Sequence, residues 1–260
     1  MHFQTDGFVK TFRVNQLCAY IYQSSPQASL AAARTAAVEI QRLIAECGRA
    51  IGLFASGPSQ QQFLESLVSA EGIEWIRVIG FQLNEYLGLE EDSPKSYRKF
   101  LIHHLVERVP MAEFHGIRGE AANAAAVCAN YASMLKSRPP DFAVLGISET
   151  GELAFNDPAV SDFADPQAVK VVELDEQCRQ RQQNDGVFVE LEEVPRRAIT
   201  LTIPTILSCQ RLFLIAFGKR KARAVRDVLN REIATACPAS ILRTHPEAHL
   251  FLDLDAAEML

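Results

Sequence analysis

The chain has 260 residues, of which 48% are hydrophobic and 22% charged, and its formal net charge is −6. This length is sufficient for one large α/β domain with a substantial buried core. The negative charge and the lack of a Lys/Arg-rich stripe argue against a nucleic-acid partner, because binding a polyphosphate requires clustered positive charge.

The N-terminal residues and the cysteines indicate the compartment. Residues 1–6 lack a charged start followed by a long apolar stretch, so we expect no signal peptide. The apolar run 212–217 is far shorter than the about 20 residues of a membrane span. The six cysteines stand singly, which favours reduced, mostly buried thiols over disulfides or structural zinc. These features predict a cytoplasmic protein without a membrane role.

Short β-branched or aromatic runs alternate along the chain with longer segments of helical spacing, a pattern typical of βαβ units around a mainly parallel sheet. The predicted strands span residues 18–22, 51–55, 77–83, 142–147, 169–174, 198–203, 212–217 and 249–252. The predicted helices span residues 26–47, 60–69, 97–107, 120–137 and 219–233. No linker or repeat divides the chain. We therefore expect a single doubly wound α/β domain over residues 1–260.

Three polar segments directly follow predicted strands, at residues 56–60, 84–88 and 148–157. Ligands of doubly wound sheets bind beyond the carboxyl ends of the strands, so we expect these segments to meet at one site. In the first segment, Ser56, Gly57 and Ser59 lie in a turn before a helix. Backbone N–H groups and hydroxyls in such a turn favour phosphate binding, although an ordinary serine-capped turn has the same residues.

The third segment combines tight-turn residues with several acids. Gly146 and Gly151 permit the backbone to turn beside a ligand, and the turn formed by Asn156, Asp157 and Pro158 aims a carboxylate. One hypothesis is that Asp157 and Glu149 raise the pKa of Glu152 enough to make it a usable acid. The alternative is a solvated acidic loop.

These segments resemble the signature motifs of the glucosamine-6-phosphate deaminase/isomerase family. Residues 146–158 read Gly-Ile-Ser-Glu-Thr-Gly-Glu-Leu-Ala-Phe-Asn-Asp-Pro, where the family has a Gly-Ile-Gly start and then Gly-His-Ile/Leu-Ala-Phe-Asn-Glu/Asp-Pro. Residues 81–89 read Phe-Gln-Leu-Asn-Glu-Tyr-Leu-Gly-Leu and are similar to the family's Phe-x-x-Asp-Glu-Tyr-x-Gly-Leu. The resemblance extends from about residue 14 to residue 253. The Ala-Phe-Asn-Asp-Pro stretch favours the deaminase branch over the 6-phosphogluconolactonases.

The resemblance implies roles for individual residues. It places Ser56, Gly57, Ser59 and Lys221 at the substrate phosphate, together with an arginine that is either Arg179 or Arg181. It places Asn84, Thr150, Glu152 and Asp157 at the proton-transfer positions, with the ionisable Glu85 beside Asn84. Four positions depart from the family pattern: Pro58 lacks an N–H, Asn84 replaces an aspartate that acts as a base, Thr150 replaces an aspartate or asparagine, and Glu152 replaces a ring-opening histidine.

The resemblance further implies a Rossmann-like fold, a small-molecule amino-sugar phosphate as ligand, and no metal or nucleotide cofactor, and it leaves homo-oligomer formation open. His245 and His249 do not suggest a metal pair, because Pro246 interrupts the helix that their spacing would require. Three functions remain: an isomerising deaminase with rerouted proton transfer, a sugar-phosphate-binding protein without turnover, and a lactone hydrolase. The residues favour the second, and the third lacks the histidine of the lactonases.

Overall fold

The computed structural model describes residues 6–260. Over this range the strands are β1 (Phe8–Val14), β2 (Leu17–Tyr22), β3 (Ala50–Phe54), β4 (Val78–Gln82), β5 (Asn84–Tyr86), β6 (Glu113–His115), β7 (Phe142–Gly146), β8 (Val169–Glu173), β9 (Arg197–Leu201), β10 (Arg211–Ala216) and β11 (Ala248–Asp253). The α-helices are α1 (Ser25–Cys47), α2 (Gln61–Val68), α3 (Tyr97–Leu101), α4 (Ala124–Ser137), α5 (Glu176–Asn184), α6 (Ile203–Leu207) and α7 (Ala222–Asn230). Short 3-10 helices at Pro58–Gln60, Trp75–Arg77, Leu191–Glu193, Lys219–Lys221 and Pro238–Thr244 and a π-helical turn at Ile102–Val106 complete the elements.

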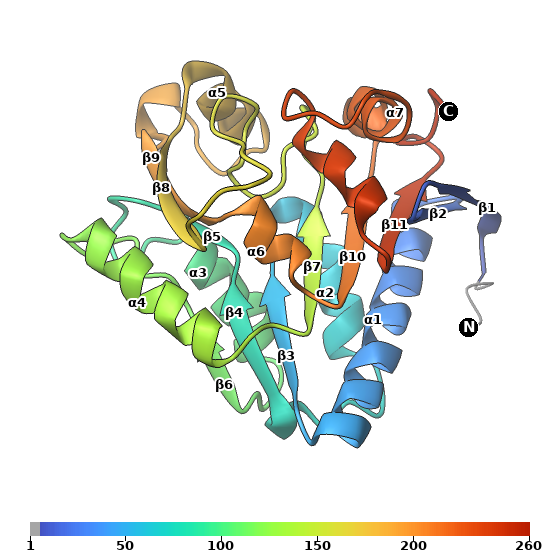
Figure 1. The fold of residues 1–260 in the computed structure, drawn as a ribbon, viewed down its shortest axis with the longest axis horizontal. Helices are drawn as coiled ribbons and strands as arrows, with labels where there is room; N and C mark the ends of the chain where they lie inside the picture. The colour runs from blue at the N-terminus through green and yellow to red at the C-terminus, as the bar shows by residue number, and fades with distance from the viewer. Residues whose placement is uncertain (1–5) are drawn as a thin grey trace.

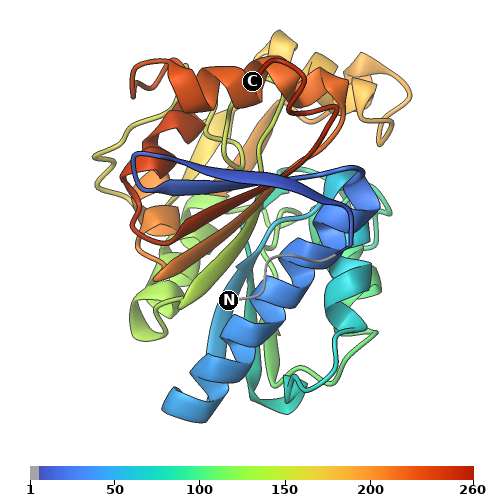
Figure 2. The same cartoon turned by 90° about the vertical axis from the view of Figure 1, so that its right-hand side faces the viewer.

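The main sheet has eight strands in the order β1-β2-β11-β10-β7-β3-β4-β6. Its strands run parallel except β1, which pairs antiparallel with β2 at one edge. Figure 2 views the molecule from this edge, with the β1–β2 hairpin in front of the sheet. The predicted α/β fold with a mainly parallel sheet flanked by helices is confirmed.

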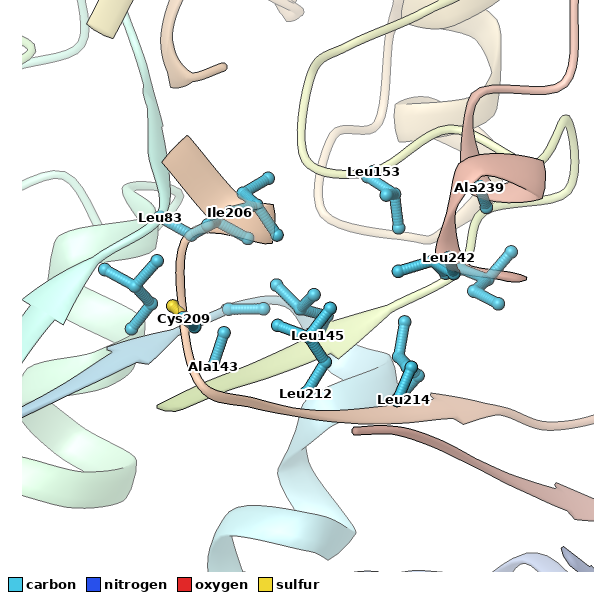
Figure 3. Packing of buried hydrophobic residues seen from close by; sticks show 14 of the residues in the cluster. Leu83, Ala143, Leu145, Leu153, Ile206, Cys209, Leu212, Leu214, Ala239 and Leu242 are labelled. Carbon is cyan, nitrogen blue, oxygen red and sulfur yellow. The ribbon is translucent and has the colours of Figure 1, made fainter. Parts of the chain in front are cut away.

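Alternating side chains of the sheet form two separate hydrophobic cores. One face packs against α1 and α2, with Phe54, Phe142 and Phe251 among its buried residues. The other face packs against α4, α7 and the segment 238–244, and Figure 3 shows part of this cluster around Leu145, Leu212 and Leu214. Because both faces are covered, the central strands are apolar throughout, as the sequence pattern predicted.

One part of the predicted sheet differs. Strands β8 and β9 do not join the main sheet; they form a separate three-stranded antiparallel sheet in the order β5-β9-β8. The prediction treated them as members of βαβ units, but no helix forms between β7 and β8, so the chain has no crossover that would return β8 to the main sheet. In Figure 1, β8, β9 and α5 lie to the upper left of the carboxyl end of β7.

Helices α1 to α4 and α7 agree with the five predicted segments, with shifted bounds, whereas α5 and α6 form outside the predicted helices. The segment 97–107 forms α3 and the π-helical turn, and α4 begins at Ala124, where Asn123 accepts a hydrogen bond from the N–H of Ala126. Among residues 6–260, none of the helices is both long and apolar enough to cross a membrane.

Candidate active site

A cavity lies where the segments that follow β3, β4 and β7 meet, bordered by α5. It brings together six of the predicted site residues: Ser56, Gly57, Ser59, Asn84, Glu152 and Lys221. The parallel direction of β3, β4 and β7 is the reason, since it places the ends of all three strands at one edge of the sheet. The cavity also has lining residues that the sequence did not single out, among them Gln60, Tyr97, Gln182 and Asp185.

Hydrogen-bonding groups without partners are among the residues that line this cavity. The Ser56 hydroxyl and the Gln60 side-chain oxygen are buried, and neither has a hydrogen-bond partner among residues 6–260. The Lys221 ammonium likewise has no hydrogen bond or ion pair within the described part of the chain. Burial lowers the pKa of Lys221, while Asp185, Glu149 and Glu152 act in the opposite direction. Unpaired buried polar groups are costly, so the cavity is suited to an anionic, hydrogen-bonding ligand.

Two glycines shape the cavity wall beside these groups. Gly57 has φ +104°, a backbone conformation that a residue with a side chain rarely adopts. A Cβ at Gly146, at the end of β7, would lie 2.8 Å from the side-chain nitrogen of Gln60. Any larger residue at 146 would therefore displace the Gln60 amide from its position in the cavity wall.

Asn84 and Glu85 lie on opposite sides of β5, as neighbours in a strand do. Asn84 lines the cavity, and its side-chain amide makes no hydrogen bond to any of residues 6–260. The Glu85 carboxylate is buried and accepts hydrogen bonds from the Gln82 amide, the Ser96 hydroxyl and three backbone N–H groups, those of Tyr86, Tyr97 and Arg98, at 2.6–3.1 Å. Burial raises the pKa of Glu85, and these hydrogen bonds act to lower it. Glu85 therefore ties the segment 85–98 together and does not line the cavity.

The loop after β7 carries Glu152 into the cavity wall. The Ser148 hydroxyl accepts hydrogen bonds from the N–H groups of Thr150, at 3.3 Å, and Glu152, at 3.1 Å. Ala154, also in the wall, has φ +55°, a left-handed conformation that is costly for a residue with a Cβ. Thr150 lies just outside the cavity lining, and its hydroxyl is 3.4 Å from Glu152 Oε2. The loop is thus held in one arrangement by its own hydrogen bonds.

Behind this wall, Glu152 and Asp157 share one partner. Arg181 Nη2 donates to Glu152 Oε2 at 2.8 Å and to Asp157 Oδ1 at 2.5 Å. Burial raises the pKa of Glu152 well above its usual range, and the neighbouring Asp157 raises it further. Cys178 lies close by, and burial together with the two carboxylates raises the pKa of its thiol.

The structure separates the two arginine candidates. Arg179 points away from the cavity and donates to the backbone oxygens of Leu191 and of Val194, the latter at 3.0 Å, so it fixes the segment after α5. Arg181 faces the two carboxylates instead. Neither arginine is among the residues that line the cavity.

Glu152, Asp157 and Cys178 are also the group of possible metal ligands found within residues 6–260, with their ligand atoms within 4.8 Å of one another. The Arg181 guanidinium already occupies the position between the two carboxylates, which favours an ion pair over a cation site. His245 and His249 have separate partners: His245 Nε2 bonds the Cys209 carbonyl at 2.8 Å, and His249 Nδ1 lies 3.2 Å from the Tyr20 hydroxyl.

Two glutamines that the sequence analysis did not single out, Gln60 and Gln182, contribute polar side chains to the cavity wall. The Gln182 side-chain oxygen accepts hydrogen bonds from the hydroxyls of Tyr86 and Tyr97, both at 2.7 Å. Gln60 directly follows the predicted phosphate turn, and Gln182 lies in a glutamine-rich stretch, so both had a weak signal in the sequence. Their role in a cavity became visible only when the strand ends were brought together.

The fold and the cavity define an α/β protein whose ligand site lies at the strand tips and is suited to an anion. The family model of glucosamine-6-phosphate isomerases/6-phosphogluconolactonase matches residues 23–251. The chain belongs to this family.

Similarity to individual relatives supports the family assignment. A glucosamine-6-phosphate deaminase of Listeria innocua is 34% identical over 206 residues, which cover 79% of this chain and 86% of the relative. The solved structure of a monomeric glucosamine-6-phosphate deaminase is 30% identical, with a TM-score of 0.84 over 93% of this chain and 99% of the other. A 6-phosphogluconolactonase of Shewanella baltica, at 18% identity and a TM-score of 0.74 over 95% of this chain and 99% of the other, shares the fold.

Proposed function

We propose that this protein binds an amino-sugar phosphate in the strand-tip cavity, as a glucosamine-6-phosphate deaminase/isomerase-like protein with impaired or altered proton transfer. The observation that carries the proposal is the shared cavity of Ser56, Gln60 and Lys221 with Asn84 and Glu152. Two unpartnered polar oxygens and an unpaired ammonium suit a phosphate and its sugar. The kinship with deaminases at about one-third identity suggests an aminated sugar.

The groups at the proton-transfer positions support altered chemistry. The Asn84 amide can hold a sugar hydroxyl but cannot accept a proton from carbon at neutral pH. General acid–base groups typically contribute about 10²- to 10⁴-fold to a rate, so we expect slow turnover at best. Glu85, the neighbouring acid, is engaged by five hydrogen-bond donors away from the cavity and does not replace it.

The alternative is a sugar-phosphate-binding or regulatory protein without turnover. The same observation of Asn84 in the cavity favours it, because Ser56 and Lys221 still line the cavity while a base is missing. The two alternatives predict the same affinity for glucosamine 6-phosphate but different release of ammonia and fructose 6-phosphate. We expect either protein to work in the cytoplasm and without a metal or nucleotide cofactor.

The binding test is thermal denaturation with glucosamine 6-phosphate, with glucosamine as the control that lacks the phosphate. A ligand at about 100 times its Kd stabilises the native state by about 2.7 kcal/mol, so the melting temperature must rise. No shift with glucosamine 6-phosphate up to millimolar concentrations would reject the proposal.

The turnover test compares ammonia and fructose 6-phosphate release by the native protein with release by a variant that carries Asn84→Asp and Glu152→His. A second variant adds Arg181→Gln, because the guanidinium now 2.8 Å from Glu152 would otherwise stand beside the new imidazole and oppose its protonation. Activity that appears only in the variants supports the binding protein. Clear turnover by the native protein supports the enzyme with rerouted proton transfer.

A further inference from the structure

Three charged side chains, those of Glu152, Asp157 and Arg181, form a group in which burial makes any net charge costly. Glu152 and Asp157 are 3% and 8% exposed, and one guanidinium nitrogen serves both carboxylates. Two ionised carboxylates beside one guanidinium would leave a net negative charge in a buried site, which is unfavourable by several kcal/mol. Carboxylates that share a site commonly keep one proton for this reason.

The other groups around Glu152 do not neutralise this net negative charge. The Thr150 hydroxyl and the Cys178 thiol are neutral, and burial and the carboxylates hold the thiol protonated by raising its pKa. Lys221, the remaining cation near Glu152, lowers the pKa of the carboxyl less than Arg181 does. Of the three charged members, Glu152 is the one that lines the cavity.

We propose that Arg181 is a positioning residue that holds Glu152 and Asp157 as a pair sharing a single proton, and that Glu152 presents this proton to an oxygen of the bound sugar phosphate. The proposal rests on the proposed function only for the identity of that ligand. In the transfer, the O–H bond at Glu152 breaks and an O–H bond forms on the ligand oxygen. Glu152 keeps the electron pair as a carboxylate, which Arg181 Nη2 stabilises, and the reverse step returns the proton.

The first test needs no ligand. The Glu152 carboxyl is followed by carbon-13 NMR of glutamate-labelled protein from about pH 4 to about pH 9, and its signal is assigned with Glu152→Gln. We expect it to titrate well above the usual value of about 4.3, and to move down by about one pH unit or more in Asp157→Asn. Arg181→Met moves the midpoint up because it removes the cation, whereas Arg181→Lys keeps it near the native value.

The matched control is Glu149→Gln, which removes a carboxylate of the same loop that pairs with Arg220 instead. It should leave the Glu152 titration close to native. A Glu152 carboxyl that titrates near 4.3, or that does not respond to Asp157→Asn, overturns the proposal. If Arg181→Met does not fold, Asp157→Asn and Arg181→Lys still decide the outcome.

The second test uses the ligand. Calorimetric titration with glucosamine 6-phosphate follows the Kd from about pH 5 to about pH 9. Because the protonated Glu152 carboxyl is the form that donates to the ligand, binding by the native protein should weaken as the pH rises through the Glu152 midpoint, and Glu152→Gln, whose amide donates at every pH, should lack this step. The same dependence of Kd on pH in both proteins overturns the transfer to the ligand. If glucosamine 6-phosphate does not bind at all, the proposed function fails, while the carboxyl titration still decides whether the pair exists.

Discussion

Replacement of Lys221 by methionine tests whether the cavity is built to bind a phosphate. The ammonium lies in the cavity wall without a hydrogen bond or ion pair to residues 6–260, and burial lowers the pKa of the side chain. Methionine keeps an unbranched, flexible stem and removes the charge. The substitution therefore separates the cost of burying the ammonium from its use in binding a ligand.

The expected effects have opposite signs with and without ligand. A hydrogen bond from a charged donor is worth about 1.5–3 kcal/mol, which corresponds to a Kd for glucosamine 6-phosphate about 10- to 150-fold weaker in Lys221→Met. Without ligand, the lowered pKa means that the folded state disfavours the charged lysine at every pH below the ordinary lysine pKa. Near neutral pH, the free energy of unfolding of the variant should thus equal or exceed that of the native protein.

The assay pairs calorimetric titration with glucosamine 6-phosphate and thermal denaturation of the ligand-free proteins. Lys219→Met is the matched control, because it makes the same change two residues away at an exposed lysine whose carboxylate partner Glu258 is 3.7 Å distant. The control should bind like the native protein. Native-like binding by Lys221→Met, or a clear loss of its ligand-free stability, would refute the reasoning.

Three further substitutions test the surroundings of the cavity. Glu85→Gln leaves at least two buried N–H donors facing the nitrogen of the new amide, so urea denaturation should show a free energy of unfolding lower by about 2–5 kcal/mol. A decrease below about 1 kcal/mol would contradict the structural role of Glu85. Below about pH 4.3 Glu152→Gln should have the same free energy of unfolding as the native protein, because the glutamine and the protonated glutamate are both neutral. As the pH rises towards the raised folded pKa of Glu152, the variant should become the more stable protein. A stability difference that does not depend on pH would contradict this expectation. Ser56→Ala should keep the melting temperature of the ligand-free protein, because the hydroxyl has no hydrogen-bond partner among residues 6–260. It should weaken glucosamine 6-phosphate binding by about 2- to 10-fold. A large drop in ligand-free stability would argue against a role of Ser56 in binding.

Much of the fold could be predicted from local patterns. The continuous apolar runs that became β3, β7 and β10 and the alanine-rich segment that became α1 have a period and length that fit one element type each. The β5-β9-β8 sheet could not be predicted in the same way. The pairing of β8 with β9 depends on the missing helix between β7 and β8 and on contacts of residues far apart in the sequence.

The candidate site, like the fold, could be predicted from the sequence only in part. The turn at 56–59, the Asn84 position and the loop with Glu152 could be predicted, because each follows directly on a strand and the ends of parallel strands meet at one edge. Which arginine faces the acids could not, since Arg179 and Arg181 are two residues apart on one helix and therefore point in different directions.

The sequence by itself thus determined that the segments after three predicted strands meet at one edge of the sheet, because each follows a strand directly and parallel strands end at the same edge. The tertiary structure alone decided how those side chains are partnered. Glu85 is enclosed by the segment 96–98, Glu152 is buried against Asp157 and Arg181, and Lys221 remains without a partner among residues 6–260. The physical reason is that desolvation and pairing, which set the ionisation of an acid or base, arise from groups that only packing brings within hydrogen-bonding distance.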